Sequence, residues 1–181
     1  MWEKDDIKKV LYTNEDIVNR CKELGKEITE DYNKEDNPLL LVALLRGSVP
    51  FLSELLKHID MDVQYDFMDV TSYVGTESQG DIKILKDLDG SIQGYDILLV
   101  EDIVDTGKTI ETVVETLFHK GAKTVRIVTL LDKPSRRVAN VKADYIGFEV
   151  GNEFVVGFGM DFDQKYRGLP YIGVLKDECY K

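Results

Sequence analysis

The sequence predicts an α/β fold in which a mostly parallel β-sheet is covered by helices on both faces. Two apolar runs, residues 39–45 (LLLVALL) and 96–100 (DILLV), are too short for helices and too continuous for half-exposed strands, which indicates strands buried on both faces. Helical patterns alternate with such runs, as is typical of strand–helix–strand units. The length of 181 residues, 43% of them hydrophobic, favours a single domain, residues 1–181, with a substantial core.

The other elements follow from apolar spacing and turn residues. Thr13 or Asn14 can cap a helix whose apolar positions recur at three- and four-residue steps until the polar stretch 33–38. Residues 49–58 and 108–120 have the pattern of two further helices. The remaining expected strands are residues 63–71, 82–86, 124–131, 144–150, 153–159 and 171–175. We expect the strands at 144–150 and 153–159 to pair with each other.

Composition excludes several classes of function. A formal net charge of −11 argues against nonspecific binding to nucleic acid or to an anionic membrane, because both depend on an excess of Lys and Arg. The sequence has no apolar run of about 18 residues and no apolar segment of a signal peptide at its start, so we expect no membrane span and a cytoplasmic location. Cys21 and Cys179 lack metal-ligand spacing and are expected to be free thiols.

Functional residues are expected in the loops that follow the strands, because ligands of parallel α/β sheets bind beyond the carboxyl ends of the strands. The stretch EDIVDTGKT has the most unusual composition of these loops. It carries three carboxylates: Glu101, Asp102 and Asp105. Its ending fits the pattern G-x-x-x-x-G-K-[ST] of phosphate-binding loops, but Asp102 stands where that pattern has its first glycine.

A helix that begins after Gly107 would point backbone N–H groups into the loop, where they can bind a phosphate. The carboxylates then need another target, such as hydroxyl groups or a divalent cation. A plain strand followed by a well-capped helix is the alternative interpretation of this stretch.

The same residues resemble the loop that binds 5-phosphoribosyl 1-diphosphate (PRPP) in the type I phosphoribosyltransferases: two acidic residues, two apolar ones, then D-T-G-x-T. Other segments resemble the bacterial hypoxanthine-guanine branch of that family: LLVALLRGS, TSYVGTESQGDI, LLDKPSRR, IGFEV and EFVVGFGMDFDQKYRGLPYIGVL. The resemblance implies the type I phosphoribosyltransferase fold, a central, mostly parallel sheet flanked by helices. It also implies a small hood built from N- and C-terminal segments and a mobile loop at about 72–81.

The resemblance implies which residues bind PRPP. Glu101 and Asp102 would bind the ribose hydroxyls, directly or through Mg²⁺. The 5′-phosphate would be held by the following loop: Asp105, Thr106, Gly107, Lys108 and Thr109. The pyrophosphate would contact another set: Arg46, Gly47, Ser72, Tyr73 and Arg167. The family often has a cis peptide bond at the position that corresponds to Leu45–Arg46. Without the resemblance, a solvated residue in an ordinary strand-to-helix turn is the default interpretation of Arg46.

Further residues are implied for the purine and for catalysis. Lys133 would donate to the purine 6-oxo group, Phe154 would stack on the ring, and the Val155 backbone would contact the purine edge. Asp161 would lie near that edge and near a second Mg²⁺, so the implied metal ligands are Glu101, Asp102 and Asp161. Asp105 would handle the N7 proton as general acid/base. From their local patterns alone, Lys133 is a surface lysine, Phe154 a core aromatic, and Asp105 a turn residue bonded to its own loop.

The implied activity is purine salvage: transfer of the 5-phosphoribosyl group from PRPP to hypoxanthine or guanine, giving IMP or GMP and pyrophosphate. An enzyme that prefers xanthine or adenine is the nearest alternative, because discrimination depends largely on backbone contacts around Val155 and on the region of Asp161. A PRPP-sensing regulator is a second alternative, but it would need a basic surface or a DNA-binding domain. Members of the family are usually homodimers or homotetramers, and the sequence does not distinguish the two.

Overall fold

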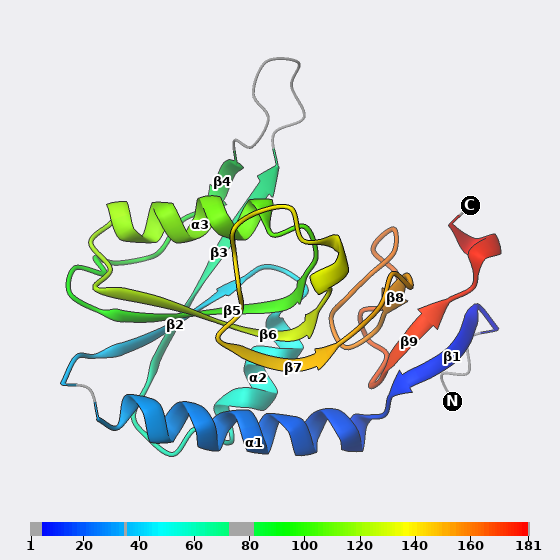
Figure 1. Ribbon diagram of the computed structural model, residues 1–181, viewed down its shortest axis with the longest axis horizontal. Coiled ribbons are helices and arrows are strands. Elements are labelled where there is room, and N and C mark those ends of the chain that lie inside the picture. The colour runs from blue at the N-terminus through cyan, green and yellow to red at the C-terminus, as the bar shows by residue number, and fades with distance from the viewer. Residues whose placement is uncertain (1–4, 35, 73–81, 181) are drawn as a thin grey trace.

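Figure 1 shows the computed structural model, which describes residues 5–34, 36–72 and 82–180. The central sheet has the strand order β4-β3-β2-β5-β6-β7. Its strands are β2 Leu39–Leu44, β3 Gln64–Ser72, β4 Ile82–Lys86, β5 Asp96–Val104, β6 Thr124–Asp132 and β7 Tyr145–Glu149. Neighbouring strands are parallel except for the β3–β4 pair. The predicted α/β fold with a mostly parallel sheet is confirmed.

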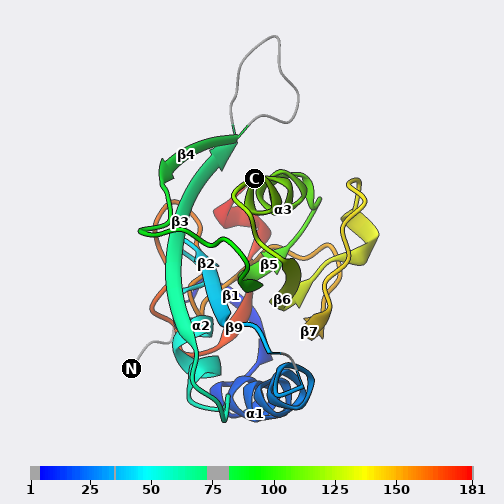
Figure 2. The same cartoon turned by 90° about the vertical axis from the view of Figure 1, so that its left-hand side faces the viewer.

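Helices cover both faces of this sheet (Figure 2). Helices α1 Asn14–Tyr32 and α2 Val49–Leu56 lie on one face, and α3 Lys108–His119 lies on the other. The start of α1 is the predicted one: the Thr13 side chain accepts a hydrogen bond from the Asp16 N–H, and the Asp16 carboxylate accepts one from the Thr13 N–H. None of the helices in the described part of the chain is long and apolar enough to cross a membrane.

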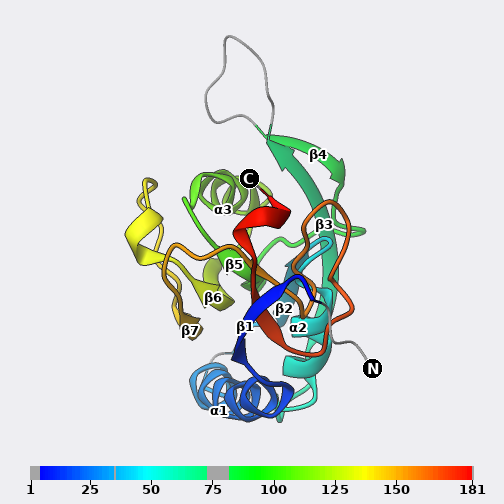
Figure 3. The same ribbon diagram turned by 90° about the vertical axis from the view of Figure 1, so that its right-hand side faces the viewer.

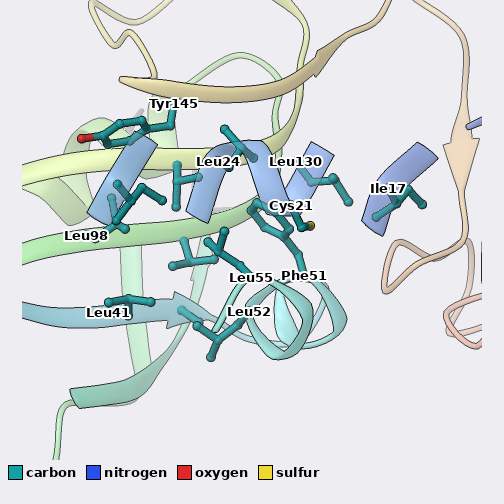
Figure 4. Packing of buried hydrophobic residues seen from close by; sticks show 14 of the residues in the cluster. Ile17, Cys21, Leu24, Leu41, Phe51, Leu52, Leu55, Leu98, Leu130 and Tyr145 are labelled. Carbon is teal, nitrogen blue, oxygen red and sulfur yellow. The ribbon is translucent and has the colours of Figure 1, made fainter. Parts of the chain in front are cut away.

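Strand β2 shows why a continuous apolar run correctly predicts a strand that is buried on both faces. Leu41 packs in the cluster under α1 and α2, whereas Leu40 and Val42 pack in the cluster under α3. Figure 4 shows the first cluster, in which α1 residues meet α2 and the sheet. Cys21 lies in this cluster, where burial raises the pKa of its thiol to about 12, and both cysteines are free, as predicted.

A second, three-stranded antiparallel sheet lies beside the carboxyl ends of the central strands (Figure 3). It has the order β1-β9-β8, with β1 Ile7–Tyr12, β8 Val155–Val156 and β9 Ile172–Leu175. Strand β1 was not predicted. The predicted pairing of segments 144–150 and 153–159 is wrong, because β7 pairs with β6 at the edge of the central sheet whereas β8 pairs with β9. The region that the resemblance assigns to the mobile loop, 72–81, lies outside the described residues apart from the Ser72 backbone at the end of β3.

Strand β5 is longer than predicted. We expected the strand to stop at Val100, but pairing with β6 continues through Ile103↔Leu131 and Val104↔Asp132. The acidic pair therefore lies within the strand instead of in a loop. Two further elements are single 3₁₀ turns, η1 Pro134–Arg136 and η2 Asp177–Cys179.

Candidate active site

Two adjoining cavities lie around the end of β5, and one of them extends to β8 of the small sheet. Their volumes are about 230 Å³ and 220 Å³, and they share Asp102, Ile103 and Asp105. The larger is also lined by the residue that follows β6, by η1 and by the segments on either side of β8: Lys133, Arg136, Asn152, Glu153, Phe154, Val155, Met160 and Asp161. The smaller is completed by Glu101, Thr106, Gly107, Thr109 and Ile110. The structure thus places the predicted PRPP loop directly beside the predicted purine residues.

The smaller cavity lies at the beginning of α3. Gly107 precedes the helix with φ = +82°, a left-handed conformation that favours glycine, and a Cβ there would lie 2.8 Å from Arg137 Cδ. No side chain caps the helix. The N–H groups of its first turn are therefore available to an anion, and the helix dipole favours negative charge at this point. Lys108, also predicted here, is exposed and lines neither cavity.

The acidic pair at the end of β5 is largely buried. Glu101 is 8% exposed, and burial together with the charge of Asp102 raises its pKa well above the usual value. Burial also raises the pKa of Asp102 to about 6, although the Ile103 N–H donates to its Oδ1 and the charge of Arg167 acts in the opposite direction. Two carboxylates in such surroundings are stabilised by any cation that arrives with a ligand.

Glu101 and Asp102 could therefore hold Mg²⁺, because a divalent cation would stabilise their buried negative charge. Mg²⁺ is usually held by one or two carboxylates together with water and substrate oxygens. Among the described residues, no group of three or more His, Cys, Asp or Glu side chains gathers as a complete metal site. Asp161, the third predicted ligand, has other partners: its Oδ1 lies 2.9 Å from Arg167 Nη2, and its Oδ2 accepts a hydrogen bond from the Gln164 N–H.

Three segments distant in sequence meet beside the acidic pair. The Leu45–Arg46 peptide bond is cis, as the resemblance implied. A Cβ on Gly47 would lie 1.7 Å from Asp102 Oδ2, and a Cβ on Gly159 would lie 1.9 Å from the Gly47 carbonyl oxygen. Neither position has room for even a methyl group, so the backbone of the 157–168 loop lies against the backbone of the 45–48 turn, and that turn lies against the Asp102 carboxylate.

Of the residues predicted to contact pyrophosphate, Arg167 has a buried nitrogen atom without a hydrogen-bond partner. Its Nη1 donates to the Gly159 carbonyl at 2.7 Å, and its Nε is buried without a hydrogen-bond partner. A buried donor left unpaired in the free protein indicates a ligand or water that completes it. Arg46 is exposed and lines neither cavity. The Ser72 side chain and Tyr73 lie outside the described residues.

The larger cavity combines a buried cation with an aromatic ring. Lys133 is only 5% exposed, and its Nζ donates to the Glu153 carbonyl at 2.8 Å, so the interpretation as a solvated surface lysine is wrong. Burial lowers the pKa of Lys133, while the charge of Asp105 acts in the opposite direction. Phe154 lines the cavity immediately before β8, and Val155 begins that strand.

Asp105 lies where the two cavities join. Its Oδ1 is 2.8 Å from Arg136 Nε in an ion pair, and it has no hydrogen bond of good geometry. This oxygen is therefore not bonded to the backbone of its own turn, as the structural alternative for this residue would require. It lines both cavities and can reach groups bound in either.

The profile of the phosphoribosyl transferase domain matches residues 9–163. The chain belongs to this family. Hypoxanthine-guanine phosphoribosyltransferase of Streptococcus thermophilus is 53% identical over 181 residues, with 99% of each chain covered. The Streptococcus pyogenes protein of that name is 51% identical over 178 residues, with 98% of each chain covered. A solved hypoxanthine phosphoribosyltransferase of Staphylococcus aureus is 48% identical, superposes with a TM-score of 0.94, and is covered completely in both directions. A Trypanosoma cruzi hypoxanthine phosphoribosyltransferase, solved with IMP, is 37% identical with a TM-score of 0.93, covering 99% of this chain and 100% of its own.

Two arginines of this phosphoribosyltransferase were not assigned from the sequence. Arg136 lines the larger cavity and pairs with Asp105. Arg137 fastens the loop: it donates to the carbonyls of Val104, Asp105 and Val141 at 3.3, 3.0 and 2.6 Å and forms an ion pair with the Asp132 carboxylate. The loop is thus held in place from the β6 side. Both residues belong to LLDKPSRR, whose paired arginines were the only signal available in the sequence.

Asp102→Asn is expected to stabilise this phosphoribosyltransferase in the absence of ligands. The pKa of Asp102 is about 6 in the folded chain, against an ordinary value of 3.8, so the folded state binds the proton more tightly than the unfolded state. The ionised carboxylate therefore lowers the free energy of unfolding above pH 6, and this loss disappears as the pH falls through the folded and then the unfolded pKa. Removing the charge should raise the free energy of unfolding at pH 7.5 by about 1–3 kcal/mol.

Urea unfolding of both proteins without ligand, at pH 7.5 and near pH 4, measures this difference. The gain should be present at pH 7.5 and nearly absent near pH 4. A variant that is less stable than the parent at both values would show that Asp102 contributes structurally through its hydrogen bond to Ile103.

Proposed function

We propose that this phosphoribosyltransferase transfers the 5-phosphoribosyl group from PRPP to hypoxanthine or guanine, giving IMP or GMP and pyrophosphate in purine salvage. The observation that carries the proposal is the pair of adjoining cavities with Asp105 where they join. One cavity has a helix N-terminus suited to a phosphate, and the other has a buried lysine and an aromatic ring suited to an oxopurine. Relatives about half identical over nearly the full length have the same activity in their names.

The reaction breaks the bond between ribose C1′ and the pyrophosphate oxygen while purine N9 attacks C1′. Positive charge builds on the ribose ring and negative charge on the departing pyrophosphate. Arg167, with its unpaired buried Nε, would stabilise the pyrophosphate, together with N–H groups of the 45–48 turn. The first turn of α3 would hold the 5′-phosphate, and Glu101 and Asp102 would orient the ribose through its hydroxyls.

Asp105 would take the N7 proton of the purine as the new bond forms at N9. The carboxylate is half-exposed and lines the purine cavity, and its pairing with Arg136 keeps it at the cavity wall in the free protein. The proton moves from purine N7 to a carboxylate oxygen of Asp105, and the electron pair of the broken C1′–O bond leaves with pyrophosphate. No covalent link to the protein is required.

Mg²⁺ is the proposed cofactor, and Glu101 and Asp102 would hold it, either directly or through water. When bound, it would neutralise charge on PRPP and on the departing pyrophosphate. The buried, charge-destabilised carboxylates support this assignment. Asp161 would take part only after its ion pair with Arg167 rearranges.

Lys133→Ala is expected to lower kcat/KM for hypoxanthine by about 10- to 150-fold with little change in PRPP affinity. The substitution removes a charge-assisted hydrogen bond to the purine 6-oxo group, a contribution of roughly 1.5–3 kcal/mol. Steady-state kinetics with each substrate varied in turn measures both parameters.

Lys142→Ala, which removes an exposed lysine outside both cavities, is the matched control and should behave as the parent protein. If Lys133→Ala has the same kcat and KM for hypoxanthine as the parent protein, Lys133 only donates a hydrogen bond to the Glu153 carbonyl and does not contact the purine.

The test of the function is incubation of the protein with PRPP, Mg²⁺ and hypoxanthine, guanine, xanthine or adenine, with pyrophosphate release as the signal. Release with the first two purines supports the proposal. A preference for xanthine or adenine would replace it with the nearest alternative. Calorimetric binding of PRPP without turnover of any purine would favour the PRPP-sensing regulator.

We also propose a cytoplasmic homo-oligomer, dimer or tetramer, that binds neither nucleic acid nor membranes. Tyr65 and Leu85, on the outer strand pair β3–β4, are 57% and 56% exposed, and a partner chain would cover such apolar side chains. The two free cysteines suit a reducing compartment. Light scattering of the purified protein gives the mass, and a monomer at micromolar concentration would contradict the oligomer.

A further inference from the structure

The ring of Phe154 is covered by a second aromatic ring from the C-terminal end of the described chain. Tyr180 is stacked on it, with ring centroids 4.8 Å apart and planes at 25°. Phe162 meets Phe154 edge-on, with centroids 5.5 Å apart and planes at 89°. Phe154 also lines the larger cavity, so part of its side chain borders open space while two aromatic rings pack against it.

Tyr180 is itself held in place by the small sheet. It follows η2, where its N–H donates to the Asp177 carbonyl at 3.2 Å and its hydroxyl donates to Asp177 Oδ1 at 3.0 Å. The start of this turn is fixed because the Lys176 N–H donates to the Asp6 carbonyl. Strand β9 is in turn joined to Phe154, whose carbonyl accepts from the Leu175 N–H at 2.8 Å. The rings of Phe154 and Tyr180 therefore both belong to segments that are hydrogen-bonded to the small sheet or continue from it.

We propose that Tyr180 is a positioning residue for the purine: it fixes the plane of the Phe154 ring so that a base in the larger cavity meets a preset stacking surface. The inference rests on the proposed function, because it takes the ligand of this cavity to be a purine. A Phe side chain rotates about two bonds, and its ring plane is defined by what packs on either side. Tyr180 covers one face of the Phe154 ring, and we place the ligand ring on the opposite face, at the larger cavity.

The three rings would then form one stack in the order Tyr180, Phe154, purine. Offset-stacked aromatic pairs stabilise beyond the burial of their area, so loss of the outer ring weakens the stack and also frees the middle ring to turn. Tyr180 itself lines neither of the two cavities. The effect of Tyr180 should therefore be confined to the base.

The test compares Tyr180→Leu with Tyr180→Phe and Tyr180→Trp in steady-state kinetics. Tyr180→Leu is expected to raise the KM for hypoxanthine by about 3- to 10-fold, with the KM for PRPP and kcat within about 2-fold of the parent. The two aromatic variants keep a stacking face and should hold the KM for hypoxanthine within about 2-fold. Equal losses for hypoxanthine and PRPP, or an unchanged KM for hypoxanthine in Tyr180→Leu, would overturn the proposal.

A double-mutant cycle with Phe154→Leu separates positioning from a general effect on folding. If Tyr180 acts through Phe154, then Tyr180→Leu should change the KM for hypoxanthine by less than about 2-fold in the Phe154→Leu background. Additive losses would show that Tyr180 acts by another route and would also overturn the proposal. The parent protein measured alongside distinguishes this failure from failure of the proposed function, in which the parent itself would turn over no 6-oxopurine.

Discussion

Asp105→Asn is expected to lower kcat by about 10²–10⁴, the usual range for loss of a general acid/base, while PRPP affinity stays within a few-fold of the parent value. Asparagine keeps the size of the side chain but cannot accept the N7 proton. The backbone that would hold the 5′-phosphate should keep its place, because Arg137 binds the Asp105 carbonyl and Thr106 accepts from the Val138 and Ala139 N–H groups. Calorimetric binding of PRPP and kcat at saturating substrates, measured on the same preparation, give the two quantities.

The opposite pattern would exclude catalysis by Asp105. A variant with weaker PRPP binding and nearly unchanged kcat would mean that the carboxylate only supports its turn, through Arg136. Asp102→Asn provides a contrasting variant from the same strand end, because it should weaken binding of PRPP with Mg²⁺. The two carboxylates are three positions apart, so this comparison tests the division of roles within one short segment.

Removal of divalent cations is expected to lower activity by at least about 10²-fold. Charge stabilisation by a bound metal contributes several kcal/mol to transition states of this kind. Without Mg²⁺, the buried Glu101 and Asp102 carboxylates would face the highly negative PRPP with no neutralising charge. Pyrophosphate release in excess chelator, compared with the same sample after an excess of Mg²⁺ is restored, measures the effect.

Two outcomes bear directly on this expectation. Recovery on adding Mg²⁺ back excludes damage by the chelator. Full activity in excess chelator would mean that PRPP is bound free of metal, and Arg167 with backbone N–H groups would have to stabilise the pyrophosphate alone.

The helices and inner strands could be predicted because their patterns reflect burial. Helix α1 has apolar positions at helical spacing and a capping box at Thr13, and β2 is apolar throughout because both of its faces are covered. Strand β1 has no such signal: the sequence IKKVLY has an exposed middle and pairs with β9 along one edge. The partners of β7 and β8 were mistaken because two strands that are neighbours in sequence belong to different sheets, a choice made by tertiary packing.

The same distinction applies to the site. The segment 101–109 could be recognised because phosphate and diol binding require particular residues at fixed spacing, and the structure places most of them around one cavity. The β5 boundary was misjudged because acidic residues are rare inside strands, and only pairing with β6 shows that the strand continues. The role of Arg137 could not be predicted, because an arginine that binds the backbone carbonyls of Val104 and Asp105, about 30 residues earlier, leaves no trace in local spacing.

The small sheet also determines when, during synthesis, the site can be completed. Strand β8 pairs with β9, and β9 pairs with β1. Strand β1, near the start of the chain, therefore has no strand to pair with until residues 172–175 have been synthesised. The strand pairs of the central sheet are complete with β7, although Val155, Phe158, Met160 and Ile172 also pack in the cluster under α1 and α2. Chains begin to fold from the N-terminal side as they emerge from the ribosome. A nascent chain that has not yet released β9 would therefore have its PRPP loop formed, while Phe154 and Val155 still lack the strand that holds them.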